Sequence, residues 1–313
     1  MVGFLIVLLA SFCFCFQNLI VRILFNEQNM FGMFQIGGYV EPTLENSFLL
    51  MFMRMVLVVP LMASLAGKLY PPTWQNIREL GKIESRPLLW RSLGGGLFMF
   101  LYLALLYLSI GLIETGIAMA LFFTYPVFTA LFSWKFFGQS PSRFRWIVML
   151  LILCGSFLTI PHHGQNSTES YSFIGVIFGI GSGMTYALYT VNAQKTFESS
   201  VHPVPFTWIS FATTLVLSAT SLLIWQSPNP DLNWTPLWIG GLCSAIVTFA
   251  GHLMNNFGIR LIGATAAATI GAINPGLTGI LAWLTIQETL TGLQLLGVVI
   301  VTFSVVLLSR EHR

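Results

Sequence analysis

The sequence predicts an all-α integral membrane protein with ten transmembrane helices, arranged as two inverted five-helix repeats. Only 8% of the 313 residues are charged and 55% are hydrophobic, whereas soluble domains carry about 25% charged residues. The chain also contains a series of apolar segments long enough to cross a bilayer, and its two halves contain matching residues. A soluble globular protein and a disordered chain are both excluded by this composition.

A helix needs about 20 mostly apolar residues to cross the hydrocarbon core. The first half of the chain contains five such segments, at Gly3–Phe25, Phe48–Ala66, Leu88–Ile110, Gly116–Phe137 and Trp146–Ile160. The second half contains five more, at Tyr171–Val191, Pro205–Trp225, Pro236–Phe257, Ala264–Ile286 and Leu290–Ser309. Most connections are short and contain helix breakers. Two are longer, a polar stretch around Asn26–Asn46 and a basic stretch around Lys68–Arg86.

The basic residues predict the orientation of these spans, because cytoplasmic connections are enriched in Lys and Arg. We place the N-terminus in the cytoplasm and assign the connections to alternate sides. Of the 14 basic residues, only Arg22 then lies outside and only Arg54 lies within a span, which leaves twelve on the inner side. We therefore expect a multi-pass protein of the cell (inner) membrane with both termini in the cytoplasm.

An internal repeat relates the two halves at a shift of 149 residues, the separation of Pro126 and Pro275. The same shift aligns three further pairs: Ala118 with Ala267, Thr129 with Thr278, and Trp134 with Trp283. Each half holds five spans, an odd number, so the second half must be inverted relative to the first. We expect two such units, residues 1–161 and 171–309, with a substrate site near the midplane where they meet.

The matched prolines indicate interruptions near the centres of the fourth and ninth spans. Proline lacks a backbone N–H and clashes with the carbonyl four residues earlier, here those of Phe122 and Gly271. A carbonyl freed in this way is tolerated in a membrane only where other groups or cavity water satisfy it. Pro126 and Pro275 are therefore predicted hinges beside the site, although both could simply bend helices for packing.

Polar side chains within the spans supply the candidate substrate-binding residues. The tyrosines inside spans could line a cavity or bond neighbouring helices. His252 could relay protons or form a hydrogen bond between helices. The predicted site comprises Asn18, Tyr102, Tyr125, Tyr186, His252 and Asn274.

Arg54 is the one basic residue deep in a span, about two turns from its outer end. It could anchor an anionic group of the substrate. Alternatively, it is a structural residue that bonds backbone carbonyls or Glu114, or that extends toward the outer surface. No carboxylate lies in the first span, which argues against a carrier of cationic drugs that exchanges protons at a buried acid.

Enzyme signatures are missing from the sequence. It contains no HExxH, Walker A or GxGxxG pattern. The run Gly181-Ser182-Gly183 is not a nucleophile elbow, and the four-residue spacing of Gly175, Gly179 and Gly183 predicts close helix packing instead. We expect no enzymatic activity, cofactor, metal or nucleic-acid partner; the partners are the lipid bilayer and a small-molecule substrate.

Short motifs make the chain resemble the EamA-type branch of the drug/metabolite transporter superfamily. They are Arg54, the segment Glu114–Pro126, its counterpart Gly263–Pro275, and the acidic turn Gln287–Thr289 before the last span. The turn Gly138–Ser140 of the first half lacks the acid and departs from the pattern. The resemblance covers nearly the whole chain and implies ten spans in two five-helix units that transport a small molecule.

The predicted function is a secondary transporter that moves a small polar metabolite by alternating access, in the outward direction. Amino acids or related compounds are the substrate class that the resemblance implies. One alternative is a phosphorylated-sugar or nucleotide-sugar carrier, which should place two or more basic residues near the midplane, where only Arg54 is available. A non-transporting membrane scaffold or receptor is another, and a membrane enzyme is a third. The sequence leaves the oligomeric state open.

Overall fold

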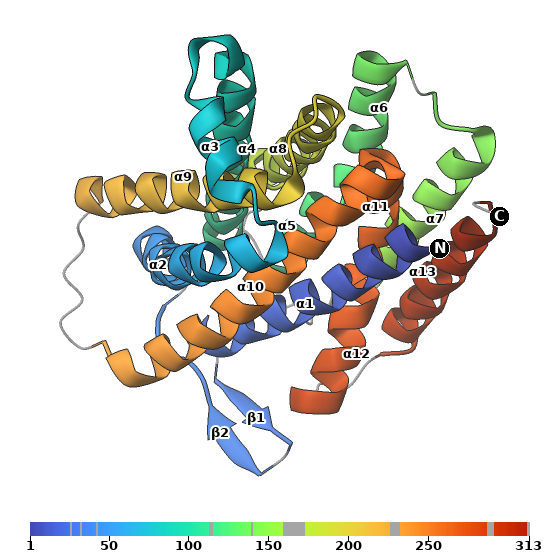
Figure 1. The fold of residues 1–313 in the computed structure, drawn as a ribbon. Coiled ribbons are helices and arrows are strands. Elements are labelled where there is room, and N and C mark those ends of the chain that lie inside the picture. Colours follow the sequence, from blue (N-terminus) through green and yellow to red (C-terminus); the bar gives the residue numbers. More distant parts are fainter. Residues whose placement is uncertain are drawn as a thin grey trace.

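A computed structural model describes residues 1–25, 27–31, 33–41, 43–112, 115–138, 140–158, 173–225, 232–286 and 291–311. Within these ranges the chain is helical apart from one small hairpin and its connections (Figure 1). The acidic residues Glu114 and Glu288, which the sequence places in outer connections, lie outside the described residues. Residues 159–172, which include the connection between the two predicted repeats, also lie outside the described residues.

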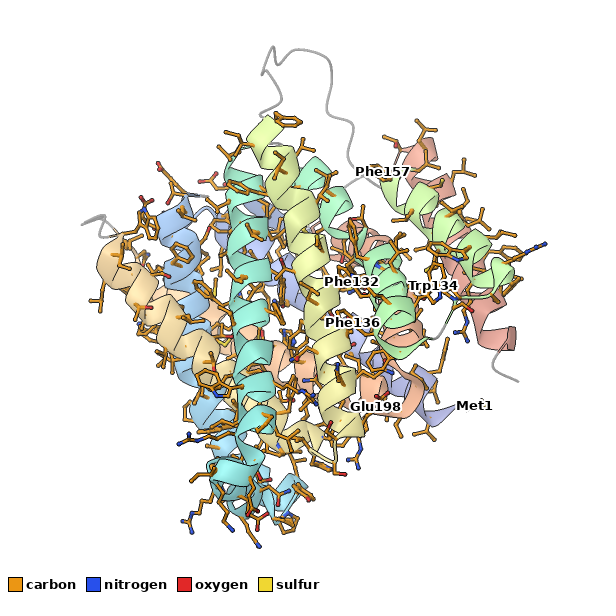
Figure 2. The ribbon with its side chains drawn as sticks, turned by 90° about the horizontal axis from the view of Figure 1, so that it is seen from above. Met1, Phe132, Trp134, Phe136, Phe157 and Glu198 are labelled. Atoms are coloured by element: carbon orange, nitrogen blue, oxygen red, sulfur yellow. The ribbon has the colours of Figure 1, made fainter. Side chains whose placement is uncertain are left out.

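Among the described residues, six helices are long and apolar enough to cross a membrane by length and composition. They are α1 (Val2–Phe25), α2 (Leu44–Leu69), α4 (Arg86–Leu112), α8 (Phe173–Glu198), α9 (Pro203–Ile224) and α10 (Trp234–Ile262). Most extend beyond the predicted spans, and α8 continues seven residues past Val191, to Glu198. Figure 2 shows Met1 and Glu198 toward one end of the helical body and Phe157, near the end of α7 (Arg143–Leu158), toward the other.

The fourth and ninth predicted spans are each divided into two helices. The fourth consists of α5 (Thr115–Phe122) and α6 (Tyr125–Phe137), and the ninth consists of α11 (Ala264–Gly271) and α12 (Asn274–Ile286). The interruptions fall where the prolines predict them, since α5 and α11 end at the residues whose carbonyls the prolines oppose. The interruptions that the matched prolines indicated are therefore confirmed.

The two longer connections contain structure that the sequence analysis did not predict. Strand β1 (Gln28–Met30) pairs antiparallel with β2 (Phe34–Ile36), and this hairpin projects from the helices (Figure 1). The Phe31 N–H donates to the carbonyl of Thr285 at 2.7 Å, which fixes the hairpin to α12. The basic connection forms the amphipathic helix α3 (Thr73–Leu80) and the short 3₁₀ helix η1 (Ile83–Ser85), and α3 packs on α9.

Helices from the two halves pack against one another throughout the molecule. Helix α4 lies along α8 and α9, and α1 lies along α10, which also contacts α2. Helices α5 and α6 pack on α8, whereas α11 and α12 pack on α1. At the edge, α7 packs on α13 (Gly292–Glu311), as Figure 1 shows. The main apolar core therefore lies between the halves and surrounds both helix interruptions.

Candidate functional site

Three of the predicted tyrosines meet in the interior beside the interruption between α5 and α6. The ring of Tyr186, on α8, lies 5.0 Å from that of Tyr102 on α4 and 4.7 Å from that of Tyr125, both edge to face. Phe122, the last residue of α5, lies within 6.0 Å of all three rings, measured between centroids. All three tyrosines are buried. Edge-to-face contacts of this kind stabilise a fixed arrangement of rings; the hydroxyls still require polar partners.

His252 of α10 adjoins this tyrosine cluster. Its Nε2 lies 3.5 Å from the hydroxyl of Tyr102, and its ring contacts Phe14 at 5.0 Å and Phe211 at 5.7 Å. The side chain is 2% exposed, and its Nδ1 has no hydrogen-bond partner in the described part of the chain. His252 therefore has one ring nitrogen available for a further hydrogen bond in the interior. Burying a polar nitrogen without a partner costs free energy.

The second interruption brings Asn274 to the same region. The thiol of Cys15, on α1, lies 3.5 Å from the Asn274 carbonyl and 3.8 Å from its Oδ1. The hydroxyl of Tyr125 points at Gly271, the last residue of α11, where a Cβ atom would lie only 2.6 Å from it. Tyr125 begins α6 and Asn274 begins α12, so the two interrupted helices face each other through these contacts.

The glycine ridge of α8 allows the first interruption to approach closely. A Cβ atom at Gly183 would lie 2.7 Å from the carbonyl oxygen of Phe122, and one at Gly179 would lie 2.9 Å from Leu121. The adjacent Ser182 donates to the carbonyl of Tyr102 at 2.8 Å. The packing role predicted for this ridge is therefore confirmed, because larger residues would separate α8 from the end of α5.

Two asparagines of α10 extend the polar interior beyond the predicted residues. Asn255 donates to the hydroxyl of Tyr186 at 3.5 Å. Asn256 bonds the hydroxyl of Tyr189 and donates to Thr207 on α9 at 2.8 Å. The predicted site omitted both asparagines, although their spacing of three and four residues from His252 places them on the same helix face. That periodicity was the available signal.

Arg54 is buried in α2 with 2% exposure. Its Nη2 donates to the hydroxyl of Tyr107 at 3.0 Å, whereas its Nε has no partner among the described residues. Its charge acts electrostatically on both His252 and Tyr102. Glu114, the acidic partner considered from the sequence, lies outside the described residues. Arg54 is thus a buried cation beside the tyrosine cluster.

The other predicted positions have different outcomes. No described contact joins Asn18 to the cluster; instead its neighbour Gln17 accepts a hydrogen bond from Thr248 of α10 at 2.8 Å. Pro126 is buried at the start of α6. The side chain of Pro275 lies outside the described part of the structure. The hinge roles of both prolines stay predictions.

The groups at this centre are phenols, amides, one imidazole, one thiol and aromatic faces. They offer hydrogen bonds and ring surfaces to a small polar molecule, which suits reversible binding. The described residues contain no group of three or more His, Cys, Asp or Glu arranged to hold a metal ion. A bundle of membrane-length helices around such a centre has the architecture of a multi-pass membrane carrier.

Comparisons with known proteins specify the family. Residues 173–310 match the EamA-like transporter family. The chain is 54% identical over 311 residues, 99% of its length and 94% of the relative's, to a Synechocystis sp. protein named "Uncharacterized transporter sll1319". It is also 26% identical over 227 residues, 70% of this chain and 69% of the relative, to the threonine/homoserine exporter RhtA of Salmonella typhimurium. This protein therefore belongs to the EamA-like transporter family, within the drug/metabolite transporter superfamily.

A solved structure described only as "Crystal structure of protein" is similar with a TM-score of 0.76. The alignment covers 99% of this chain and 98% of that one at 16% sequence identity. At this identity the likeness concerns the fold alone. It extends over nearly the whole chain.

Proposed function

We propose that the protein exports an amino acid or a related small polar metabolite across the cell membrane by alternating access. In this proposal the chain crosses the membrane ten times, as two inverted five-helix repeats at residues 1–161 and 171–309. The observation that carries the proposal is the meeting of the two interrupted helices. Tyr125 and Asn274 open their second segments, and both lie at a buried polar centre.

The packing of the helices supports two related repeats. If α1, α2, α4, α5, α6 and α7 correspond to α8, α9, α10, α11, α12 and α13, most contacts between the halves occur in matched pairs. Helix α4 packs on α8 as α10 packs on α1, and α4 packs on α9 as α10 packs on α2. Likewise, α5 and α6 pack on α8 as α11 and α12 pack on α1. A pseudo-twofold axis between inverted repeats produces such a pattern.

The orientation of the termini is part of the proposal. Met1 and Glu198 lie toward one end of the helical body and Phe157 toward the other (Figure 2). This is the arrangement expected if the N-terminus is cytoplasmic and the chain crosses the membrane five times before α8. The concentration of Lys and Arg in the connections at the first of these ends favours the cytoplasm for that side.

The substrate class rests on the chemistry of the centre together with the RhtA relatives, whose name refers to threonine and homoserine export. Hydroxyl and amide groups on Tyr102, Tyr125, Tyr186 and Asn274 suit a small polar solute. In the alternating-access cycle, the two broken helices change their angle about Pro126 and Pro275, since an interrupted helix lacks a continuous hydrogen-bond ladder at that point.

Purified protein in proteoliposomes tests this proposal with labelled L-threonine, L-homoserine and other amino acids. Asn274→Ala should raise the KM for the transported amino acid about tenfold, the loss expected for a hydrogen bond to a charged or strongly polar group. Tyr125→Phe should change KM less than Tyr125→Ala, because the ring remains as a wall. For Asn274→Ala, expression and thermal stability should stay close to those of the wild type.

Two results would contradict the site. If both alanine variants transport with unchanged KM while Pro275→Ala alone damages folding, the interruptions are architectural and the substrate binds elsewhere. If another class of metabolite is transported and no amino acid is, the proposed substrate class is wrong. The position of the site is then tested by measuring the KM of the same variants for that metabolite.

A further inference from the structure

Arg54 is a permanent positive charge in the interior of a membrane protein. An arginine guanidinium has five N–H donors and stays protonated at any physiological pH. Only one described hydrogen bond uses these donors, from Nη2 to the hydroxyl of Tyr107 at 3.0 Å. A phenol is neutral, so this bond does not itself compensate the charge. The Nε atom is buried without a partner in the described part of the structure.

No acidic residue within the ten predicted spans is available to neutralise that charge. All eleven Asp and Glu residues fall in the connections, at helix ends or in the tail. Glu45, the described acid nearest to Arg54 along α2, lies in the first turn of that helix, nine residues away. Nine residues of helix rise about 13 Å. No described carboxylate forms an ion pair with Arg54.

A buried cation with no ion-pair partner among the described residues is expensive and is kept where it serves a purpose. Two other buried groups with hydrogen-bonding capacity lie within electrostatic reach of Arg54. Among the described residues, Nδ1 of His252 has no partner, and the hydroxyl of Tyr102 forms one long contact, to that histidine at 3.5 Å. If the Tyr102 hydroxyl donates to Nε2, the neutral imidazole carries its proton on Nδ1 and presents a further buried donor. These groups come from α2, α10 and α4, three different helices.

We propose that Arg54 is the anchor for a carboxylate of the transported molecule. This inference rests on the proposed function, because it assigns one end of an amino-acid substrate to a particular residue. The substrate carboxylate supplies the negative charge that the spans lack, and a guanidinium binds a carboxylate through two parallel hydrogen bonds. The ammonium group of the same substrate then lies over the rings of the tyrosine cluster, where aromatic faces attract a cation.

The test compares a substrate with the analogue in which an uncharged amide replaces the carboxylate, in the same proteoliposomes. L-threonine and L-threoninamide differ in the carboxylate, and the ratio of their transport rates does not depend on how much protein is active. The wild type should favour threonine by about ten- to hundredfold, as expected for a charge-assisted hydrogen bond. Arg54→Gln should reduce this ratio to about one. Arg54→Lys keeps the charge but loses the planar fork, and it should give an intermediate ratio.

Arg91→Gln is the matched control, because it removes a guanidinium that bonds Ser199 at 3.0 Å, near the end of α8 that carries Glu198. This variant should keep the wild-type ratio. A purely structural Arg54 would lower the transport of both compounds together and leave the ratio unchanged, which overturns the proposal. If Arg54→Gln does not fold, Arg54→Lys is measured in its place. A ratio for Arg54→Lys equal to that of the wild type would overturn the proposal.

A second measurement separates the anchor from the proposed function. Suppose that the wild type transports neither compound. The apparent melting temperature is then measured with propionate and with propionamide at equal ionic strength. Stabilisation by propionate alone, lost in Arg54→Gln, supports the anchor while the amino-acid proposal fails for threonine. Equal effects of the acid and the amide in the wild type overturn the anchor itself.

Discussion

The two interrupted helices have the same backbone plan but different surroundings. The first breaks between Phe122 and Tyr125, and tyrosines of α4 and α8 pack around it. The second breaks between Gly271 and Asn274; all eight residues of α11 before it are buried, and most are small. The first interruption is therefore surrounded by aromatic rings, whereas the second lies in closely packed small residues.

In the proposed two-repeat arrangement, this difference indicates how two related halves can bind an asymmetric molecule. Both breaks lie at the centre of the protein. If only the backbone is considered, they provide two equivalent positions there. The side chains remove that equivalence, since one break offers rings and hydroxyls and the other offers an amide and a thiol. The contact of Tyr125 with Gly271 joins the two. Equivalent substitutions at the two breaks should therefore have different effects on stability and transport.

The largest effect is expected at the glycine ridge that accommodates the first break. Gly183→Ala would place a Cβ atom 2.7 Å from the backbone carbonyl of Phe122, which cannot move without shifting the end of α5. Overpacking of this kind costs about 1–3 kcal/mol. We expect a lower melting temperature in detergent and a marked loss of transport.

Gly181→Ala is the matched control for that variant. It lies two residues away on α8, and its new Cβ atom would meet only Leu105, at an ordinary contact distance of 3.6 Å. Replacement of a helical glycine by alanine should add about 0.5–1 kcal/mol of stability. If both variants are equally tolerated, the close approach of α8 to the first break is not required.

An intermediate effect concerns pH and lies away from both breaks. His202, just before α9, stacks on Tyr70 at 3.8 Å and contacts Phe257. Burial, reinforced by the charge of Arg260, lowers the pKa of His202 to about 4 from its ordinary value of 6.5. The unfolded chain therefore binds more protons than the folded one between pH 6.5 and 4, so stability should fall as the pH drops through that window.

His202→Phe keeps an aromatic ring against Tyr70 but cannot titrate. Melting temperatures measured from pH 7 to pH 4 should decrease less in this variant than in the wild type. Substrate KM at a fixed pH should be the same for both, because neither break is touched. An equal decrease in the two proteins would assign the pH effect to other groups, such as surface carboxylates.

The smallest effect separates the two breaks most cleanly. Thr129 of α6 donates to the carbonyl of Tyr125 at 2.9 Å and contacts Thr190 at 3.4 Å. The hydroxyl of its counterpart Thr278 is buried beside the Cys15 thiol and forms no hydrogen bond of ordinary geometry with a described residue. Thr129→Val should cost about 1 kcal/mol, whereas Thr278→Val should cost almost nothing or stabilise the protein slightly. Equal losses in thermal unfolding would mean that the two breaks are supported alike.

Much of this architecture follows from local sequence signals. The apolar segments and prolines locate the helices and both interruptions, because membrane thickness and proline stereochemistry act on short stretches of chain. The ends of the helices were less predictable. For example, α8 continues to Glu198 because its polar residues Gln194 and Thr196 pack inside the protein rather than against lipid.

Which residues form the candidate site depends on contacts between helices that are far apart in the sequence. Tyr102, Tyr125, Tyr186 and His252 are brought together, as polar residues in apolar spans should be. The link from Asn274 to Cys15 was not predictable, since a cysteine in an apolar helix has no signal that distinguishes packing from contact with a site. Asn18 illustrates the opposite case, because only the angle of α1 decides whether residue 17 or 18 faces the interior.

Cys15 allows the most direct test of the central claim that substrate binds where the two breaks meet. A variant with Cys13, Cys154 and Cys243 replaced by alanine leaves Cys15 as its one thiol, and its alkylation by N-ethylmaleimide can be timed in proteoliposomes. The transported amino acid should slow this reaction, with a half-maximal concentration equal to the transport KM. A second variant that retains only Cys13, which faces Gly251 of α10, should react at the same rate with and without substrate. Unchanged labelling of Cys15 at saturating substrate would contradict the account.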